Sequence, residues 1–194
     1  KKKEVIFHSR SRTKTVYFVY SGEVMLYNLT KHGNRKVIFI LGKGRLLNQS
    51  IVSKKPNALF CEAACPVQVI EIAEKQFLQL MEQSHALTRA VLREYERNLW
   101  RMGHQLKNTT GNMQMERKIA AKLWKLGRDF GVDTEDGVMI DIDLTITLMA
   151  DLVGAPRENV SRACKVLTDR GLIRYGNKRF ILIDFDGLAK FYKM

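Results

Sequence analysis

Cysteine is scarce in this chain of 194 residues, which contains only Cys61, Cys65 and Cys164. An odd number of cysteines without metal-ligand spacing argues against a disulfide scaffold and fits a reducing cytosol. Long apolar runs are also missing, because charged residues interrupt each of them before about 18 residues, and this excludes a membrane span. Lys1–Lys3 are followed by a mixed segment without an apolar core, so we expect no signal peptide and a cytoplasmic protein.

Histidine is sparse as well, and its four positions are far apart in the sequence. They are His8, His32, His85 and His104. Such scattered residues cannot form the His/Glu metal cluster of a cupin-like β-roll enzyme, and an iron–sulfur sensor needs more cysteines. We therefore expect no enzyme activity, no metal and no haem. Cys61 and Cys65 alternate to the same face of a strand region and could pair, whereas Cys164 is expected to pack as a small core residue.

Basic residues outnumber acidic ones, and the excess is unevenly distributed. The formal net charge is +13. Residues 1–112 hold 19 Lys and Arg against 8 Asp and Glu, whereas the chain from Met113 onward holds 14 against 12. Net charge alone indicates attraction to polyanions in general. A prediction of DNA binding must therefore depend on how particular residues are arranged.

The N-terminal part is predicted to be β-structure. Short apolar runs are separated by turn signals at Ser21-Gly22 and His32-Gly33-Asn34. The runs are Thr15–Tyr20, Val24–Leu29, Lys36–Leu41, Leu59–Ala63 and Val67–Ile72. Strands at such regular spacing predict a small barrel or sandwich over residues 1–73. The sequence starts without methionine and partway into an apparent strand, which leaves open whether an upstream segment is missing.

Helical periodicity begins at Glu74. A short helix is predicted at Lys75–Gln83, and a long one from about Ser84 to Thr110. The apolar residues of the long helix recur every three or four positions, which indicates one helical face. They are Leu87, Val91, Tyr95, Leu99, Met102 and Leu106. Gly111-Asn112 breaks the pattern and is predicted to be a hinge.

The C-terminal part shows a helix at Met115–Phe130, a turn at Thr134–Gly137, a strand at Val138–Ile142, and then helix, turn, helix and two strands. Thr145 suits the N-cap of a short helix through Leu152. Gly154 can adopt the positive φ that ends this helix, and Pro156 suits the first position of the next, Pro156–Arg170. That helix is predicted to bury its apolar side, which consists of Val160, Ala163, Val166 and Leu167. Leu172–Tyr175 and Arg179–Ile183 form a hairpin, the wing, around Gly176-Asn177.

The outward face of this second helix has the chemistry that base recognition needs. The N-terminal residues of a helix in the major groove reach the base edges. Arg157 and Arg162 can each bridge O6 and N7 of guanine, and Glu158 can accept a hydrogen bond from cytosine N4. Phosphate contacts are predicted for Thr145, Lys165, Lys178 and Arg179, and Ser161 suits a phosphate or a base. The alternative is a solvated helix face on a winged helix that binds only proteins.

Residues 154–162, Gly-Ala-Pro-Arg-Glu-Asn-Val-Ser-Arg, with Leu167 and Gly171-Leu172-Ile173, resemble the helix-turn-helix of the CRP/FNR family. The segment Tyr17–Val24 is similar to barrel strands of that family. The resemblance implies an α+β fold with an N-terminal β-roll of the jelly-roll type, a long dimerisation helix and a C-terminal winged helix-turn-helix. The expected domains are residues 1–83, 84–112 and 113–194.

The resemblance also implies partners. They are double-stranded DNA with a near-palindromic operator, RNA polymerase, and a second copy of the chain. On the family's pattern Arg157, Glu158 and Arg162 read bases, and Ser161 matches the FNR-like variant. We expect an effector in the roll to reposition the long helices, with motion at Gly111-Asn112 setting the two recognition helices about 34 Å apart.

The cyclic-nucleotide branch holds its ligand with Gly-Glu and then Arg-Ser after the middle strands. Here the corresponding stretch is Gly44–Gln49 followed by Asn57-Ala58, so that Gln49 replaces the glutamate and Asn57 the arginine. A buried cyclic phosphate would lack its countercharge, which argues against cyclic AMP. The expected effector pocket comprises Arg45, Asn48, Gln49, Asn57 and Ala58. Lys43, Arg45, Lys54 and Lys55 flank it, which leaves open either an anionic effector of another kind or ordinary loop solubility.

Overall fold

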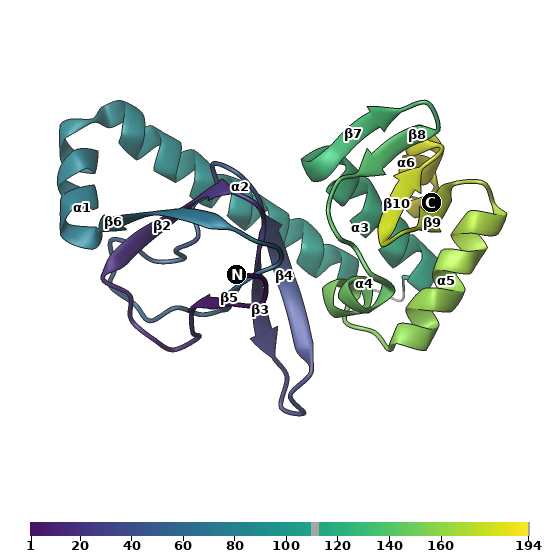
Figure 1. Cartoon of the computed structure of the whole chain (residues 1–194), viewed down its shortest axis with the longest axis horizontal. Helices are drawn as coiled ribbons and strands as arrows, with labels where there is room; N and C mark the ends of the chain where they lie inside the picture. Colours follow the sequence, from purple (N-terminus) through teal and green to yellow (C-terminus); the bar gives the residue numbers. More distant parts are fainter. Residues whose placement is uncertain (110–112, 194) are drawn as a thin grey trace. The chain divides into compact units, whose positions relative to one another are not determined.

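The computed structural model describes residues 1–109 and 113–193, and for 107–109 it describes the backbone only. The chain divides into two compact units, each described here by itself (Figure 1). Unit 1 contains Lys1–Gly33 and Val37–Leu106, and unit 2 contains Asn34–Lys36 and Lys107–Met194. The predicted hinge at Gly111-Asn112 lies outside the described residues. No described helix combines the length and the apolar character that crossing a bilayer requires.

Unit 1 is a β-roll made of a four-stranded and a two-stranded antiparallel sheet. The larger sheet has the strand order β1-β5-β3-β4, and the smaller one pairs β2 with β6. The bounds are β1 Val5–Phe7, β2 Thr15–Ser21, β3 Val24–Leu29, β4 Arg35–Leu41, β5 Phe60–Ala63 and β6 Gln68–Ala73. Alternation of apolar side chains places one set inside the roll. Phe7, Val24, Leu41 and Cys61 belong to this interior and are almost completely buried.

Two helices follow the roll, α1 at Glu74–Gln83 and α2 at His85–Thr109. Val91 of α2 is buried in a second cluster together with Val16 of the roll and Phe77 of α1, and the half-buried Leu87 and Tyr95 pack against this cluster. The apolar ridge of α2 is therefore divided. Its first half packs on the roll of the same chain, and its second half is exposed, with Leu99, Met102 and Leu106 between 51% and 71% accessible.

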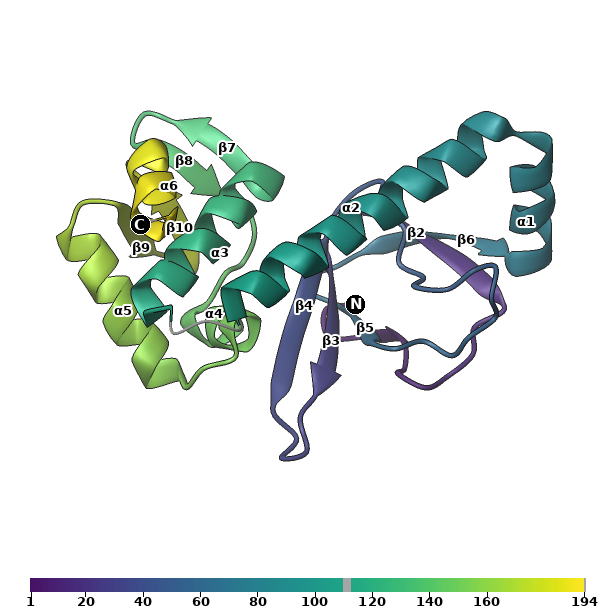
Figure 2. The same ribbon diagram turned by 180° about the vertical axis from the view of Figure 1, so that it is seen from behind.

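Unit 2 contains a four-stranded antiparallel sheet with the order β7-β8-β10-β9. Its elements are α3 Met115–Phe130, β7 Gly131–Thr134, β8 Gly137–Ile140, α4 Ile146–Val153, α5 Arg157–Asp169, β9 Ile173–Gly176, β10 Arg179–Leu182 and α6 Phe185–Lys193. Every helix contributes to one core, which contains Leu123, Met149, Leu167, Phe180 and Leu188. Figures 1 and 2 show α5 at the rim of this unit, so that one side of the helix packs inward and the other has no covering element within the unit.

The predicted fold class is confirmed, and the helix-turn-helix elements lie within about one residue of their predicted ends. Three elements were given no bounds by the sequence analysis. Strand β1 is only three residues long, and β7 is exposed along its whole length, so neither has a hydrophobic period. Helix α6 was missed although a local signal exists, because Asp184 Oδ1 accepts a hydrogen bond of 2.7 Å from the Gly187 amide and so caps the helix.

Candidate nucleic-acid interface

The turn between α4 and α5 is fixed by local backbone chemistry. Thr145 Oγ1 accepts a hydrogen bond of 3.0 Å from the Leu148 amide, which confirms Thr145 as the N-cap of α4. Gly154 ends α4 in the left-handed region at φ 73°, where a Cβ would be strained. Pro156 occupies the N-cap position of α5, one residue earlier than predicted, and it offers no side-chain cap. The first-turn amides of α5 thus have no side-chain partner from Pro156.

Helix α5 is anchored by one apolar side. Val160, Ala163, Cys164 and Leu167 are all at most 5% accessible. Burial raises the pKa of the Cys164 thiol to about 11, in keeping with its predicted role as a small core residue. Val166 was predicted to be buried, but this is wrong. At about 100° per residue it lies at the border of the buried side, and it is 36% accessible.

The opposite side of α5 presents the predicted reading residues. All five are exposed: Arg157, Glu158, Ser161, Arg162 and Lys165. At about 100° per residue they fall within an arc of about 140° of the helix, on the side away from the buried residues. Arg162 Nη2 donates a hydrogen bond of 2.6 Å to Asn159 Oδ1. Asn159 was not among the predicted site residues, although its i, i+3 spacing from an arginine is a visible signal.

The wing is the hairpin of β9 and β10, and Arg179 pairs with Gly176 across it. Asn177 and Lys178 take positive φ values of 49° and 61° in its turn, and Lys178 is exposed. The predicted phosphate ligand Arg179 is held by an ion pair with Asp141. The charge of Arg179 is therefore partly neutralised by Asp141 in this structure.

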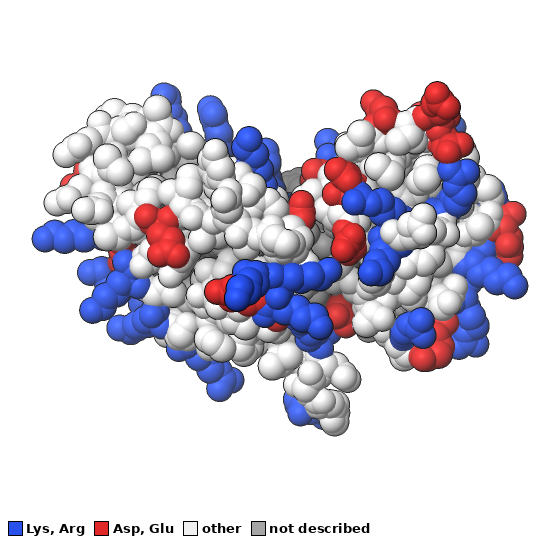
Figure 3. All heavy atoms as spheres, in the orientation of Figure 1, with Lys and Arg blue, Asp and Glu red and all other residues white. Residues whose placement is uncertain are grey.

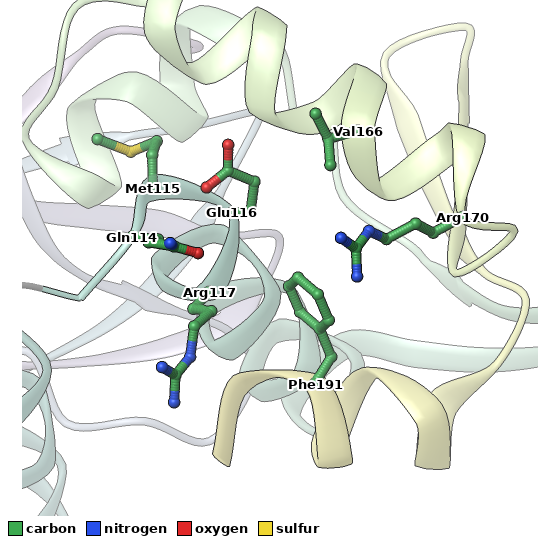
Figure 4. A pocket seen from close by; sticks show the side chains of 7 residues that line it. All are labelled: Gln114, Met115, Glu116, Arg117, Val166, Arg170 and Phe191. Atoms are coloured by element: carbon green, nitrogen blue, oxygen red, sulfur yellow. The ribbon is translucent and has the colours of Figure 1, made fainter. Parts of the chain in front are cut away.

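An open groove of about 650 Å³ lies beside α5, between α3 and α6 (Figure 4). Its lining is Gln114, Met115, Glu116, Arg117, Val166, Arg170 and Phe191. Both arginines make contacts within the unit. Arg117 Nη2 donates to the Tyr192 carbonyl at 3.4 Å, and the Arg170 guanidinium lies 5.0 Å from the ring centre of Phe191. The groove is thus bordered by the flank of the recognition helix that carries Val166.

Two of the predicted effector residues of the roll, Arg45 and Asn48, form hydrogen bonds with other residues of unit 1. Arg45 Nε donates to Glu94 Oε1 of α2 at 2.6 Å, and its Nη2 donates to Asn98 at 3.1 Å. Asn48 is buried, and its side chain bonds to the backbone of Tyr17 and of Thr15. These two residues therefore tie the loop to its surroundings.

Gln49, Asn57 and Ala58 lie together. Gln49 Oε1 accepts hydrogen bonds from the amides of Ala58 and Leu59, at 2.9 and 3.1 Å. Gln49 Nε2 is buried with no hydrogen-bond partner. Gln49 Oε1 therefore already holds two amides, and Arg45 is paired with Glu94.

The cysteines do not form a pair. Cys65 Sγ lies 2.9 Å from Glu23 Oε2, and all three cysteines are free thiols. Burial, and then the hydrogen bond to Glu23, raises the pKa of Cys65. Among the described residues no group of three His, Cys, Asp or Glu side chains is close enough to hold a metal ion.

Two family models match the chain. A Crp-like helix-turn-helix domain matches residues 117–191, and a cyclic nucleotide-binding domain matches residues 1–84. The chain is similar to the cAMP-activated global transcriptional regulator CRP of Haemophilus influenzae, at 25% identity over 185 residues, which are 93% of this chain and 80% of that protein. It is similar to the global nitrogen regulator of Nostoc sp. at 24% identity over 179 residues, 91% of this chain and 80% of that one.

A solved structure has the same fold. FixK2 from Bradyrhizobium japonicum superposes with a TM-score of 0.84 at 20% identity, over 98% of this chain and 93% of that one. The helix-turn-helix model includes α5, the helix whose exposed face carries the predicted reading residues. The chain belongs to the CRP/FNR family of transcription regulators and contains that family's DNA-binding helix-turn-helix.

Proposed function

We propose that the chain acts in the cytoplasm as a homodimer that binds a near-palindromic operator, under the control of an effector in the roll other than cyclic AMP. One observation carries the first part of this proposal. Arg157, Glu158 and Arg162 are all exposed on a helix whose other side is buried in the core of unit 2. These side chains can then replace their contacts with water by contacts with base edges in a DNA groove, and the core of unit 2 stays intact.

The reading residues differ in what they contribute. Two guanidinium groups suit guanines, and Glu158 suits a cytosine amine. Ser161 contacts a base or the phosphate beside it. Lys165 and Lys178 are exposed cations that suit phosphates, and Arg179 would join them after leaving Asp141. The hydroxyl of Thr145 remains able to donate to a phosphate while it accepts from Leu148.

The exposed half of α2 supports the dimer. Leu92, Leu99, Met102 and Leu106 recur at seven, three and four residues, and all are exposed. At about 100° per residue they lie within roughly 80° of one another, which is the seam that two helices share in a coiled coil. Leu87, Val91 and Tyr95 belong to the same ridge, but within unit 1 they pack on the roll. In the dimer they would hold the first half of this helix on the roll, while the exposed second half meets the other copy.

The roll supports the effector part. Its residues 1–84 match a cyclic nucleotide-binding domain, but Gln49 and Asn57 replace the family's glutamate and arginine. A shift between two dimer geometries would set the separation of the two recognition helices. The segment Gly111-Asn112 is our candidate for the hinge. RNA polymerase is the partner that the family implies.

Replacing Arg162 by Ala tests the DNA-reading role. We expect a loss of about 1–3 kcal/mol in duplex binding that is confined to one base position per half-site. Lys165→Ala is the matched control, because loss of a phosphate contact weakens binding to all sequences alike and reduces the salt dependence by about one charge. Selection from random duplexes, followed by titration at several salt concentrations, measures both. If wild type holds no duplex at low salt, the proposal of DNA binding fails.

A further inference from the structure

Five cationic side chains lie on two adjoining loops of unit 1 and form what we term the basic rim: Arg10, Arg12, Lys14, Lys54 and Lys55. All five are exposed. Their side chains make no ion pair or hydrogen bond within the part of the chain that the structure describes. Figure 3 shows lysine and arginine spheres along the edge of unit 1, where Figure 1 draws these loops.

The two loops are held against each other by backbone hydrogen bonds. The Arg10 amide donates to the Asn57 carbonyl at 2.7 Å, and the Asn57 amide donates to the Ser11 carbonyl at 2.9 Å. Ser9 Oγ donates to the Ala58 carbonyl at 3.1 Å. Chains paired in this way lie about 5 Å apart. Side chains on both loops can therefore converge on one ligand.

No acidic side chain of these segments offsets the charge. Between residues 5 and 61 the sequence contains a single acidic residue, Glu23, and ten Lys or Arg. Glu23 is bound to Cys65, and the nearby Glu94 is held by Arg45. Outside this range the Glu74 amide donates to the Lys14 carbonyl at 2.9 Å, so one acidic residue adjoins the rim at Lys14. None of the five cations forms an ion pair with a described residue, so their charge remains for a partner from outside the chain.

The backbone adds an independent indication. Arg10 and Lys54 both have positive φ, at 64° and 52°. Glycine or asparagine adopts this region with less strain than a long side chain does. Strained backbone positions of this kind cluster at functional sites such as ligand-binding sites.

We propose that the basic rim binds a small ligand with two or more closely spaced phosphates, and that such oligophosphates are the effector class of the roll. The second part rests on the proposed effector control. Guanidinium groups bind phosphate oxygens in a bidentate manner, and lysines add point charges. Several cations on two adjoining loops match several linked anions better than a single one. A nucleic-acid strand would need cations along a track, whereas these lie on two short loops.

A chain of hydrogen bonds leads from the rim to α2. Ala58 donates to Gln49, and the carbonyl of the adjacent Asn48 accepts from Tyr95 Oη at 3.4 Å. Tyr95 is on the half of α2 that packs against the roll. A ligand that orders the Lys54–Ala58 loop therefore acts on the helix that we propose joins the two copies.

Calorimetric titration of the whole chain with inorganic tripolyphosphate, in magnesium-free buffer, tests the rim. We expect one site per chain, and a Kd raised at least tenfold in Lys54→Asn/Lys55→Gln and in Arg10→Asn/Arg12→Gln, where asparagine keeps the left-handed backbone favourable. The matched control is Lys31→Gln/Lys75→Gln, which removes the same charge from two exposed positions elsewhere. It should leave the Kd within twofold of wild type.

Three results would overturn the proposal. They are no tripolyphosphate binding beyond that of sulfate at equal ionic strength, an equal loss in the control, and loss of duplex binding by the rim variants in the absence of any anion, which would make the rim a nucleic-acid contact. Duplex binding is measured in parallel. Tripolyphosphate should change the duplex Kd of wild type but not of the rim variants. If the anion binds and the duplex does not, the rim stands as a site while the proposed function fails.

Discussion

Asn159 Oδ1 holds the Arg162 guanidinium by a hydrogen bond of 2.6 Å, one turn apart on α5. An arginine side chain loses about 2 kcal/mol of rotamer entropy when it is fixed. A guanidinium that is already oriented loses less on meeting a guanine, and it keeps N–H groups free for O6 and N7. Asn159 is therefore a positioning residue for the base contact that we assign to Arg162.

Replacing Asn159 by Ala should weaken operator binding by about 0.5–1 kcal/mol, because one exposed hydrogen bond and its pre-orientation are lost. The loss should be confined to the base position that depends on Arg162. Asn159→Asp keeps the acceptor oxygen and should retain the preference. Competition with duplexes substituted at each position measures this. A loss of equal size at every sequence would show that Asn159 contacts the backbone of the duplex instead.

Asp141 forms an ion pair with Arg179, the residue that we propose contacts phosphate. Replacing Asp141 by Asn removes the ion partner, so we expect tighter binding to all duplexes and a salt dependence that is steeper by about one charge. The double variant Asp141→Asn/Arg179→Gln should lose this gain. Titration of a random duplex at several salt concentrations measures both slopes. If the double variant binds as tightly as the single one, the gain comes from the removed carboxylate alone and Arg179 does not contact phosphate.

The exposed seam of α2 predicts how the dimer can be broken. Burying one leucine contributes roughly 1.5–3 kcal/mol, and each substitution acts twice in a symmetric dimer. Leu99→Glu and Leu106→Glu should therefore raise the dimer dissociation constant by at least a hundredfold, as measured by sedimentation equilibrium. Arg89→Glu changes an exposed residue on another side of the same helix and should leave it unchanged. Monomeric wild type would contradict the homodimer.

Local signals were sufficient for the DNA-reading unit. Thr145, Gly154 and the apolar spacing of α5 each act within a few residues, so the sequence predicted them correctly. Long-range contacts could not be predicted in this way. Arg45 meets Glu94 across 49 positions of sequence, and no pattern within one segment reports such a pair.

The apolar ridge of α2 illustrates the same limit. Its spacing is uniform from Leu87 to Leu106, so the sequence predicts one continuous face. The structure divides this face, because only its first half lies where the roll's second cluster can cover it. Which half meets the roll depends on tertiary packing, and periodicity holds no information about it.

The Arg45–Glu94 pair is predicted to fasten α2 to the roll. Both side chains are at most 15% exposed and 2.6 Å apart, so removing one leaves the other partly buried without a partner. Arg45→Gln and Glu94→Gln should each lower the free energy of unfolding by about 2–3 kcal/mol. The double variant Arg45→Met/Glu94→Met should lose less than the two single losses combined. Urea unfolding gives these values, and additive losses would show that the two residues act separately.

Cys61 predicts how stability changes at high pH. Burial, followed by the charge of Glu62, raises the pKa of this thiol from 9.0 to about 12. The folded protein therefore keeps a proton that the unfolded chain has already released above pH 9. The free energy of unfolding should fall as pH rises from 9 towards 12, by up to about 1.4 kcal/mol per pH unit from this group.

The measurement is urea unfolding of wild type and Cys61→Ala at pH 7 and pH 10.5. Wild type should lose about 2 kcal/mol more than the variant between these two values, because only wild type has this thiol to ionise. Cys65→Ala is the matched control, since Cys65 is less buried and its removal should change the pH dependence less. An equal pH dependence in wild type and Cys61→Ala would show that the thiol ionises as readily in the folded roll as in the unfolded chain. The Cys61 side chain would then have to be accessible to water, contrary to its place in the interior of the roll.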